Sequence, residues 1–249
     1  MMHNISYRIW AACATGISIE PNRANVMAFP TEPKTTQNRV LLVHGIGDSA
    51  ASMRILQQRL ARDGRESVAI DLQDGDGRMS LEALSLHLDD YVQDHFPPNE
   101  SFDLVGFSMG GLVCRYYVQI LGGNSRIDRL VTISTPNNGT LLAFLNGRVA
   151  CREMRPGSPF LQKLNRDCSA LRDVNVISFW TPWDLVILPA KSSRMPVGRN
   201  MEIPAFAHPL MILQKRPLDE IAKALSQPIR GGIQIAADTA ATTAVPAVR

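Results

Sequence analysis

The chain lacks several features that would assign it to a class at once. Its 249 residues include only four cysteines, too few for the disulfide framework of a small secreted domain. No apolar run approaches the ~20 residues that a membrane-spanning helix requires. The formal charge of +3 comes from scattered Lys and Arg, so no nucleic-acid-binding surface is indicated. The remaining composition, 45% hydrophobic and 20% charged, is that of an ordinary globular domain.

Metal-binding patterns are scarce as well. There is no His-Glu-x-x-His sequence and no cluster of cysteine and histidine residues. The segment from Asp71 to Gly77 is acidic and rich in glycine, like a calcium loop. In EF-hand register, however, its first and last ligand positions are Leu72 and Ala83, which supply no carboxylate. We therefore expect a solvated loop here, no catalytic metal and no cofactor.

The four cysteines are not expected to form a disulfide framework, and free thiols are favoured for Cys151 and Cys168. Cys114 falls on an apolar helical stretch, where a small buried thiol is the simplest interpretation. Cys151 and Cys168 could pair only in an oxidising compartment. Cys13 lies in the apolar segment 9–19, which is similar to a short signal sequence. Few basic residues precede that segment, and Trp10 fits a lipoprotein cleavage site poorly. We therefore expect a cytoplasmic protein, with export as the alternative.

Both ends of the chain differ from its centre. Residues 1–38 contain several prolines among polar residues and show no clear hydrophobic period, so we interpret them as an N-terminal extension. Residues 228–249 are rich in Ala and Thr and have little to bury, which predicts a disordered tail.

Between these ends, apolar runs alternate with helical periodicity, so residues 39–227 are predicted to form an α/β domain. The alternation predicts a mostly parallel sheet with helices on both faces, in which catalytic groups lie at the carboxyl ends of strands. Residues 136–171 interrupt the alternation and are interpreted as a short cap segment. The expected strands are 39–43, 67–70, 102–107, 129–134 and 174–179, and the expected helices are 50–62, 81–92, 109–121 and 218–225.

The most informative segment is Gly106-Phe-Ser-Met-Gly110, a Gly-x-Ser-x-Gly pattern between an apolar strand and a helical run. A strand that turns abruptly into a helix leaves no room for side chains at the two glycine positions. The serine between them is then held on a strained corner with its hydroxyl pointing out of the sheet. The pattern alone arises by chance, but the strand–turn–helix context is the one it requires. Ser108 is therefore the candidate nucleophile.

A serine hydroxyl needs a base, and the base needs a third group to orient it. His208 is the one histidine downstream of Ser108, where the order Ser…Asp/Glu…His places the base. Asp184 fits the acid, because it follows the end of a predicted strand. The alternatives are a turn histidine before Pro209 and a turn-forming aspartate. Three other aspartates precede strands instead of following them: Asp128, Asp167 and Asp173.

The reaction also needs backbone N–H donors for an oxyanion. The residue after the nucleophile, Met109, supplies one. The second is expected from Ile46, in the loop after the first strand, because Gly45 lets the backbone turn inward there. His44 is expected to tie this loop by hydrogen bonds and to take no direct part in the chemistry.

These segments resemble the α/β-hydrolase superfamily and, within it, the small bacterial triacylglycerol lipases and carboxylesterases. The resemblance runs from about residue 39 to residue 225, and Ser-Met-Gly-Gly and Ser-Thr-Pro are its most lipase-specific parts. It implies Ser108 as nucleophile, Asp184 and His208 as its partners, and Ile46 and Met109 as oxyanion donors. The larger secreted lipases differ in having a signal peptide, a calcium site and a longer cap. The matching segments are His44-Gly45, Gly106–Gly111, Ile133–Pro136, Asn138–Thr140, Trp180–Asp184 and His208-Pro209.

We therefore expect a serine hydrolase that cleaves carboxylic acyl esters of small molecules or lipids through an acyl-enzyme. Two alternatives keep the triad and change the reaction: an acyltransferase and a thioesterase. A third is a non-catalytic, ligand-binding member of the fold. No nucleic-acid partner is expected, whereas transient contact with a membrane surface is compatible with a lipid substrate.

The segment Leu141-Leu-Ala-Phe-Leu145 has four large apolar residues in five positions, more than one buried helix stripe needs. Leu141 and Phe144 are our candidates for lining an acyl pocket as part of the cap. The alternative is that both faces of this segment are buried beneath residues 151–167.

Overall fold

The computed structural model describes residues 37–228. Cys13, the apolar stretch 9–19 and residues 229–249 lie outside this range. The assignments made for them, and the compartment inferred from the N-terminal stretch, therefore stay predictions.

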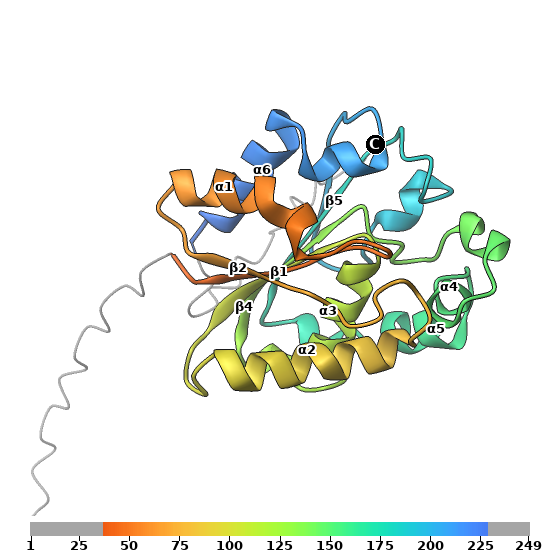
Figure 1. Cartoon of the computed structure of the whole chain (residues 1–249), viewed down its shortest axis with the longest axis horizontal. Helices are drawn as coiled ribbons and strands as arrows, with labels where there is room; N and C mark the ends of the chain where they lie inside the picture. The colour runs from red at the N-terminus through yellow and green to blue at the C-terminus, as the bar shows by residue number, and fades with distance from the viewer. Residues whose placement is uncertain (1–36, 229–249) are drawn as a thin grey trace, which may run out of the picture. The chain divides into compact units, whose positions relative to one another are not determined.

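Six strands form one parallel sheet in the order β2-β1-β3-β4-β5-β6 (Figure 1). This confirms the predicted α/β architecture. The central strands β1 and β3 are buried along their whole length, as near-continuous apolar runs require. The strands are β1 (Val40–Val43), β2 (Ser67–Ile70), β3 (Phe102–Phe107), β4 (Ile127–Ile133), β5 (Asn175–Trp180) and β6 (Arg199–Glu202).

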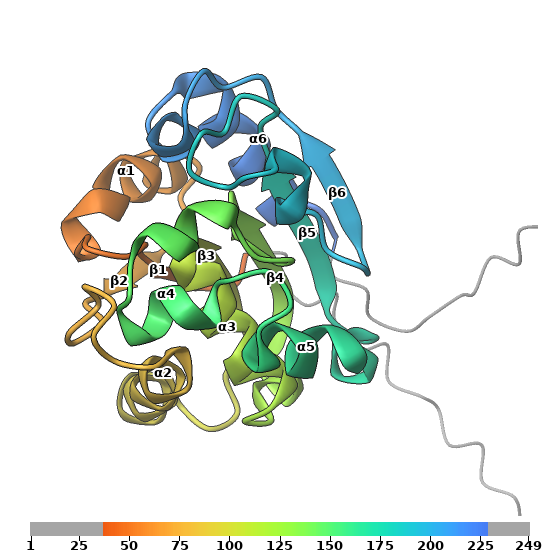
Figure 2. The same cartoon turned by 90° about the vertical axis from the view of Figure 1, so that its right-hand side faces the viewer.

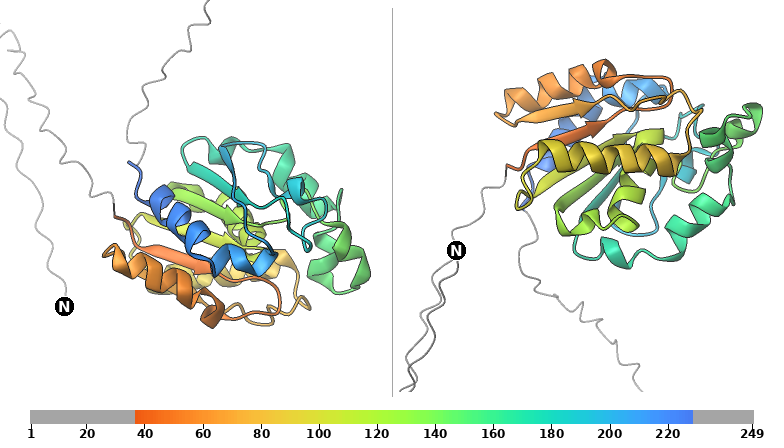
Figure 3. Two further views of the ribbon diagram at one scale, coloured as in Figure 1. Left: turned by 90° about the horizontal axis from the view of Figure 1, so that it is seen from above. Right: turned by 60° about the horizontal axis from the view of Figure 1, so that its bottom comes forward.

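Helices cover both faces of the sheet, and each face has its own hydrophobic core (Figure 1, Figure 3). One core contains the apolar side chains of α2, α3, α4 and α5, and the other those of α1 and α6. The α-helices are α1 (Arg54–Arg62), α2 (Leu81–His95), α3 (Met109–Gln119), α4 (Val149–Glu153), α5 (Pro159–Arg166) and α6 (Lys215–Leu225). The 3-10 helices are η1 (Ala50–Met53), η2 (Gly123–Ser125), η3 (Leu141–Leu145), η4 (Ser169–Leu171), η5 (Ala190–Ser193) and η6 (His208–Ile212).

The helix starts follow from local sequence chemistry. Ser80 caps α2, because its side-chain oxygen accepts a hydrogen bond from the backbone N–H of Ala83 at 3.1 Å. Helix α3 is buried on all sides from Met109 to Val118, and most of its side chains are apolar. It packs against β3 beneath the carboxyl edge of the sheet and so fixes the position of Ser108.

Some elements were not predicted. Strand β6 is short and polar, and its residues are half-buried or exposed, so it has neither an apolar run nor an alternating pattern. Helices α4 and α5 lie within residues 136–171, the predicted cap segment, to which no helix had been assigned; both lie in front of the sheet in Figure 2. Helix α6 begins at Lys215 instead of residue 218. The stretch 50–62 begins as the 3-10 helix η1 and continues as α1.

The cysteines within the described range, Cys114, Cys151 and Cys168, are free thiols. Burial raises the pKa of the Cys114 thiol well above its ordinary value. Across residues 37–228, no helix combines the length and the apolar character needed to cross a bilayer.

Candidate active site

Ser108 lies on a strained turn between β3 and α3. Its backbone has φ 53° and ψ −123°, a conformation that a residue with a side chain rarely adopts. A Cβ atom on Gly106 would lie 2.4 Å from the Cα of Gly111, and one on Gly110 would lie 2.4 Å from the carbonyl oxygen of His44. The strand, the turn and the helix thus approach one another too closely for side chains at both glycine positions, which confirms the predicted reason for the motif.

The loop after β1 lies close to the start of α3, and the side chain of His44 ties it to the loop after β2. The backbone N–H of Leu72 donates to Nε2 of His44 at 3.0 Å, so the other ring nitrogen, Nδ1, carries the proton. That nitrogen donates to the carbonyl oxygen of Gly45 at 2.8 Å. The ring is buried. The predicted structural role of His44 is confirmed: it ties the loops after β1 and β2 together.

Asp184 lies in the loop after β5 and makes three charge-assisted hydrogen bonds. Its Oδ1 accepts from the backbone N–H groups of Val186 and Ile187, both at 2.9 Å. Its Oδ2 accepts from Nδ1 of His208 at 2.8 Å. Burial alone would raise the pKa of Asp184, but the hydrogen bond and charge of His208 and the two backbone donors hold that pKa below its ordinary value. The carboxylate is therefore fixed in place and ionised.

His208 is the first residue of η6, and Pro209 follows it at the start of that helix. Its ring lies 4.9 Å from the ring of Phe107, measured between centroids. Phe107 is the residue before Ser108, so this contact places the imidazole beside the strand–helix turn. Because Nδ1 is engaged by Asp184, Nε2 is the nitrogen that can exchange a proton with a reacting group.

Ser108 and His208 line one cavity of about 270 Å³ at the carboxyl edge of the sheet. Ile46 lines the same cavity. Met109 is the first residue of α3, so its N–H belongs to the amides that have no acceptor within the helix. The fold therefore brings the five residues chosen from the sequence into one region. The other lining residues are Gly45, Asp48, Phe107, Val186 and Pro209.

A second cavity of about 190 Å³ adjoins the first, because Ile46 and Val186 line both. Its walls come mainly from η3, the loop after η3 and α4, and they are predominantly apolar. The remaining lining residues are Thr140, Leu142, Ala143, Asn146, Cys151 and Met154.

Only some side chains of the apolar segment η3 line the second cavity. Leu142 and Ala143 line the second cavity, whereas Leu141 and Phe144 are each 56% exposed and do not line it. Leu145 is 83% exposed. The alternative in which both faces of this segment are buried is therefore wrong. The substrate-binding role suggested for Leu141 and Phe144 stays a prediction.

Arg115, on the helix that follows Ser108, is a buried residue that the sequence analysis did not identify. It lies on α3 with no exposed surface, and burial lowers the pKa of its guanidinium to about 10. The guanidinium donates to the side chain and carbonyl of Asn137, to the carbonyl of Leu164 and to the side chain of Asn165. Arg115 thus ties α3 to the cap segment. The available signal was a single cation inside an otherwise apolar helical stretch.

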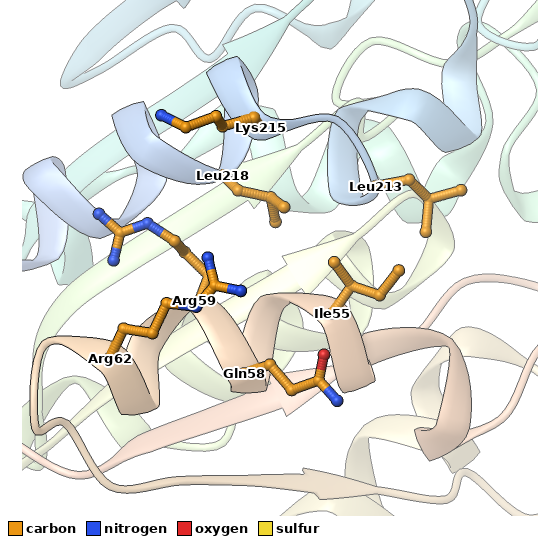
Figure 4. A pocket seen from close by; sticks show the side chains of 7 residues that line it. All are labelled: Ile55, Gln58, Arg59, Arg62, Leu213, Lys215 and Leu218. Atoms are coloured by element: carbon orange, nitrogen blue, oxygen red, sulfur yellow. The ribbon is translucent and has the colours of Figure 1, made fainter.

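A separate hollow of about 220 Å³ lies between α1 and α6 and shares no lining residue with the two cavities above (Figure 4). Three cationic side chains, Arg59, Arg62 and Lys215, surround it together with apolar ones. Arg59 is paired with Asp63 at 2.8 Å and with Asp219 at 2.6 Å, and Lys215 also contacts Asp219. Most of the positive charge is therefore compensated.

Residues 37–228 contain no group of three or more His, Cys, Asp or Glu side chains placed to hold a metal ion. In the calcium-like loop, Asp71 accepts a hydrogen bond from the backbone N–H of Ala50, and Asp76 pairs with Arg78 at 3.1 Å.

Comparisons with known proteins agree with this architecture. The mouse lysosomal thioesterase PPT2 is 29% identical over 116 residues, which are 45% of this chain and 38% of that protein. Protein phosphatase methylesterase 1 of Schizosaccharomyces pombe is 34% identical over 104 residues, 36% of this chain and 30% of that protein. The matches therefore span less than two fifths of the length of these relatives.

Solved structures support the same fold. The mature Bacillus licheniformis lipase BlEst2 aligns with a TM-score of 0.65 at 15% identity, covering 78% of this chain and 94% of that one. Aspergillus fumigatus lipase B aligns with a TM-score of 0.66 at 16% identity, covering 79% and 54%. At such identities the likeness shows the α/β-hydrolase fold alone.

The family model for palmitoyl protein thioesterases matches residues 39–183, which are more than half of the chain. The matched region includes Ser108 and ends one residue before Asp184. The chain therefore has the α/β-hydrolase fold and belongs to the palmitoyl protein thioesterase family.

Proposed function

We propose that this protein is a serine hydrolase that cleaves acyl esters through Ser108, His208 and Asp184. One observation carries the proposal: the carboxylate of Asp184 holds Nδ1 of His208 at 2.8 Å, in the cavity that Ser108 enters from a strained strand–helix turn. A nucleophile, a base and a group that orients the base are the minimum that this reaction needs.

The reaction begins when Nε2 of His208 takes the proton of the Ser108 hydroxyl and Oγ forms a bond to the acyl carbon. The carbonyl π electrons move to oxygen and produce a tetrahedral oxyanion. When this collapses, the bond to the leaving group breaks and His208 returns the proton to the departing oxygen or sulfur. Water then attacks the acyl-Ser108 ester by the same route. Asp184 keeps the imidazole in the required tautomer and stabilises its charged form.

The oxyanion is proposed to bind the backbone N–H groups of Ile46 and Met109. Met109 N–H lies at the start of α3, where the helix dipole also favours negative charge. The loop that carries Ile46 is pressed against the turn, since a Cβ on Gly45 would be 3.2 Å from the Cβ of Ser108. Backbone N–H donors that already point to the oxyanion position need not reorient when the negative charge develops in the transition state.

The acyl group is proposed to extend from Ser108 between Ile46 and Val186 into the second cavity. The two residues line both cavities, and the second cavity offers an apolar surface that includes Cys151 and Met154. Each methylene buried there would add about 0.8 kcal/mol to binding. An acyl chain longer than acetyl is therefore the expected substrate, in a small molecule or a lipid.

Thioesters are the second candidate substrate class. Membership of the palmitoyl protein thioesterase family and the similarity to the thioesterase PPT2 favour them. A thiol leaves more readily than an alcohol, because thiols have a pKa of about 8.5. Thioester cleavage should therefore depend less on proton return from His208 than oxygen-ester cleavage does.

The decisive test compares three variants with the wild-type chain, using a matched oxygen ester and thioester with the same acyl group and labelling by a fluorophosphonate probe. Ser108→Ala should abolish labelling and reduce turnover by up to about a millionfold, as in other serine triads. Asp184→Asn should cost about 10⁴-fold, because the imidazole is left in the wrong tautomer.

Asp173→Asn is the matched control, since Asp173 is exposed and precedes β5. A folded Ser108→Ala protein with unchanged turnover would contradict the proposal, as would a large loss in Asp173→Asn alone. Product analysis with added alcohol separates hydrolysis from acyl transfer, and the ratio of the two kcat/KM values separates an esterase from a thioesterase.

A further inference from the structure

Large apolar side chains are exposed mainly around the mouth of the active-site cavity. Of twelve such residues across the described range, eight lie in three short segments, which we call the apolar rim. The rim is formed by η3, by the loop after β5 and by the residue two positions before His208. Its members are Leu141, Leu142, Phe144, Leu145, Trp183, Leu185, Val186 and Phe206.

The three segments form one continuous surface. The hydroxyl of Thr140 donates to the carbonyl oxygen of Val186 at 2.7 Å, and the N–H of Leu141 donates to the carbonyl of Leu188 at 2.8 Å. The rings of Trp183 and Phe206 stack at a centroid distance of 5.2 Å. Trp183 and Leu185 flank Asp184 in sequence, so part of the rim belongs to the loop that carries the candidate acid.

The exposed charges around η3 and in the loop after β5 have one sign. Residues 139–155 and 181–196 contain two acidic side chains, and neither is available at the surface. Asp184 is buried against His208, and the half-buried Glu153 accepts a hydrogen bond from the N–H of Leu81. Arg155 places its guanidinium 5.0 Å from the ring centroid of the exposed Phe144. The remaining cations in these ranges are Arg148, Arg152, Lys191 and Arg194.

The loop after β2 carries acidic side chains close to one of these cations. Asp76 contacts Arg148 at 3.5 Å and Arg78 at 3.1 Å, so the charge of Arg148 is partly compensated. An anionic surface would therefore attract mainly Arg152, Arg155, Lys191 and Arg194.

We propose that the apolar rim docks the protein onto the surface of an anionic phospholipid bilayer and so places the mouth of the active-site cavity at the lipid. An exposed apolar patch of this kind marks an interaction surface. Tryptophan and phenylalanine side chains partition into the region between headgroups and acyl chains, and flanking Lys and Arg interact with anionic headgroups. The rim supplies both parts of this interaction.

The test measures binding of the full chain to phosphatidylcholine vesicles with and without phosphatidylglycerol, by co-sedimentation at low and high NaCl. The wild-type chain should bind the anionic vesicles more tightly, and salt should weaken that preference because it screens exposed charges. The triple variant Leu145→Ser/Leu185→Ser/Phe206→Ser should bind at least about tenfold more weakly, since three exposed apolar anchors are lost. Lys191→Glu/Arg194→Glu should remove the preference for anionic lipid.

The matched control is Ile55→Ser/Leu86→Ser, which removes two apolar residues exposed elsewhere, at 41% and 48%. It should bind as the wild-type chain does. Turnover of a short water-soluble ester by the triple variant should stay within a few-fold of wild type, which shows that the fold and the site are intact.

Two results would overturn the proposal: equal vesicle binding by the triple variant and the wild-type chain, or an equal loss in the control. A rim that instead joins two copies of the chain would appear as a dimer that the triple variant dissociates, without a change in vesicle binding. Because binding is measured without turnover, these outcomes do not depend on the proposed catalytic function.

Discussion

Replacing Gly110 with alanine should damage activity much more than stability. The added Cβ would lie 2.4 Å from the carbonyl oxygen of His44 and 2.5 Å from that of Val43. Both are backbone atoms, so no side-chain rotation can relieve the contact. The loop after β1 and the start of α3 must move apart from 2.4 Å toward the 3.4 Å of ordinary contact, a displacement of about 1 Å.

That displacement separates the two groups proposed to bind the oxyanion. Ile46 lies on the displaced loop and Met109 at the start of α3, so they cannot both keep their geometry toward one oxygen. Losing one oxyanion donor costs about 100- to 1000-fold in rate, and a misplacement of ~1 Å costs about 100-fold. Overpacking lowers the free energy of unfolding by about 1–3 kcal/mol. We therefore expect kcat to fall at least about 100-fold in a protein that still folds.

Steady-state kinetics with a short ester and thermal unfolding measure the two effects separately. Gly147→Ala is the matched control, since a Cβ there meets no atom within 4 Å, and it should leave kcat unchanged. A folded Gly110→Ala protein with wild-type kcat would refute the reasoning. Equal losses of kcat in Gly110→Ala and Gly147→Ala would also refute it, because the contact between residue 110 and the His44 carbonyl would then not explain the loss.

Three further outcomes are expected. Leu142→Ala, which enlarges the second cavity, should shift the preferred ester toward longer acyl chains. Leu141→Ala should produce the same shift if Leu141 lines the acyl pocket, as the sequence predicts. Both are measured as kcat/KM across a series of acyl chain lengths. Arg115→Met should lower the free energy of unfolding by about 2–4 kcal/mol, measured by denaturant titration, because several buried acceptors lose their donor. Because the pKa of Asp184 is held below its ordinary value, its carboxylate should stay ionised between about pH 8 and about pH 5 and should not lower kcat/KM there; an NMR titration that shows protonation of this carboxylate in that range would contradict the assignment.

The arrangement of the candidate site was predictable because a parallel sheet brings the carboxyl ends of its strands to one edge. Ser108 follows β3 and Asp184 follows β5, so their meeting required only the correct strand assignments. The sequence could not predict that Asp184 and His208 lie within hydrogen-bonding distance. That distance depends on the conformation of residues 185–207, which include β6, a strand without an apolar pattern.

Side chains that break the usual rules of burial were the hardest to place. Periodicity assigns an apolar cluster to a core, so it could not show that Leu145 is 83% exposed. The same rule assigns a cation to the surface, yet Arg115 has no exposed surface because carbonyl and amide oxygens satisfy its donors. In both cases the tertiary partners decide, and they come from parts of the chain far away in sequence.

One hydroxyl connects the acyl-binding and catalytic parts of the proposed site. Thr140 Oγ1 donates to the carbonyl of Val186 at 2.7 Å and accepts from the N–H of Leu188 at 2.9 Å, in the loop whose start is fixed by Asp184. It also accepts from the N–H of Leu142 at 3.3 Å, at the beginning of η3. The wall of the second cavity and the loop that supports the carboxylate are therefore joined by hydrogen bonds through Thr140. Changes in the cap that move η3 should act on kcat through Asp184 as well as on KM through the acyl chain, which distinguishes this cap from a lid that opens independently of the triad.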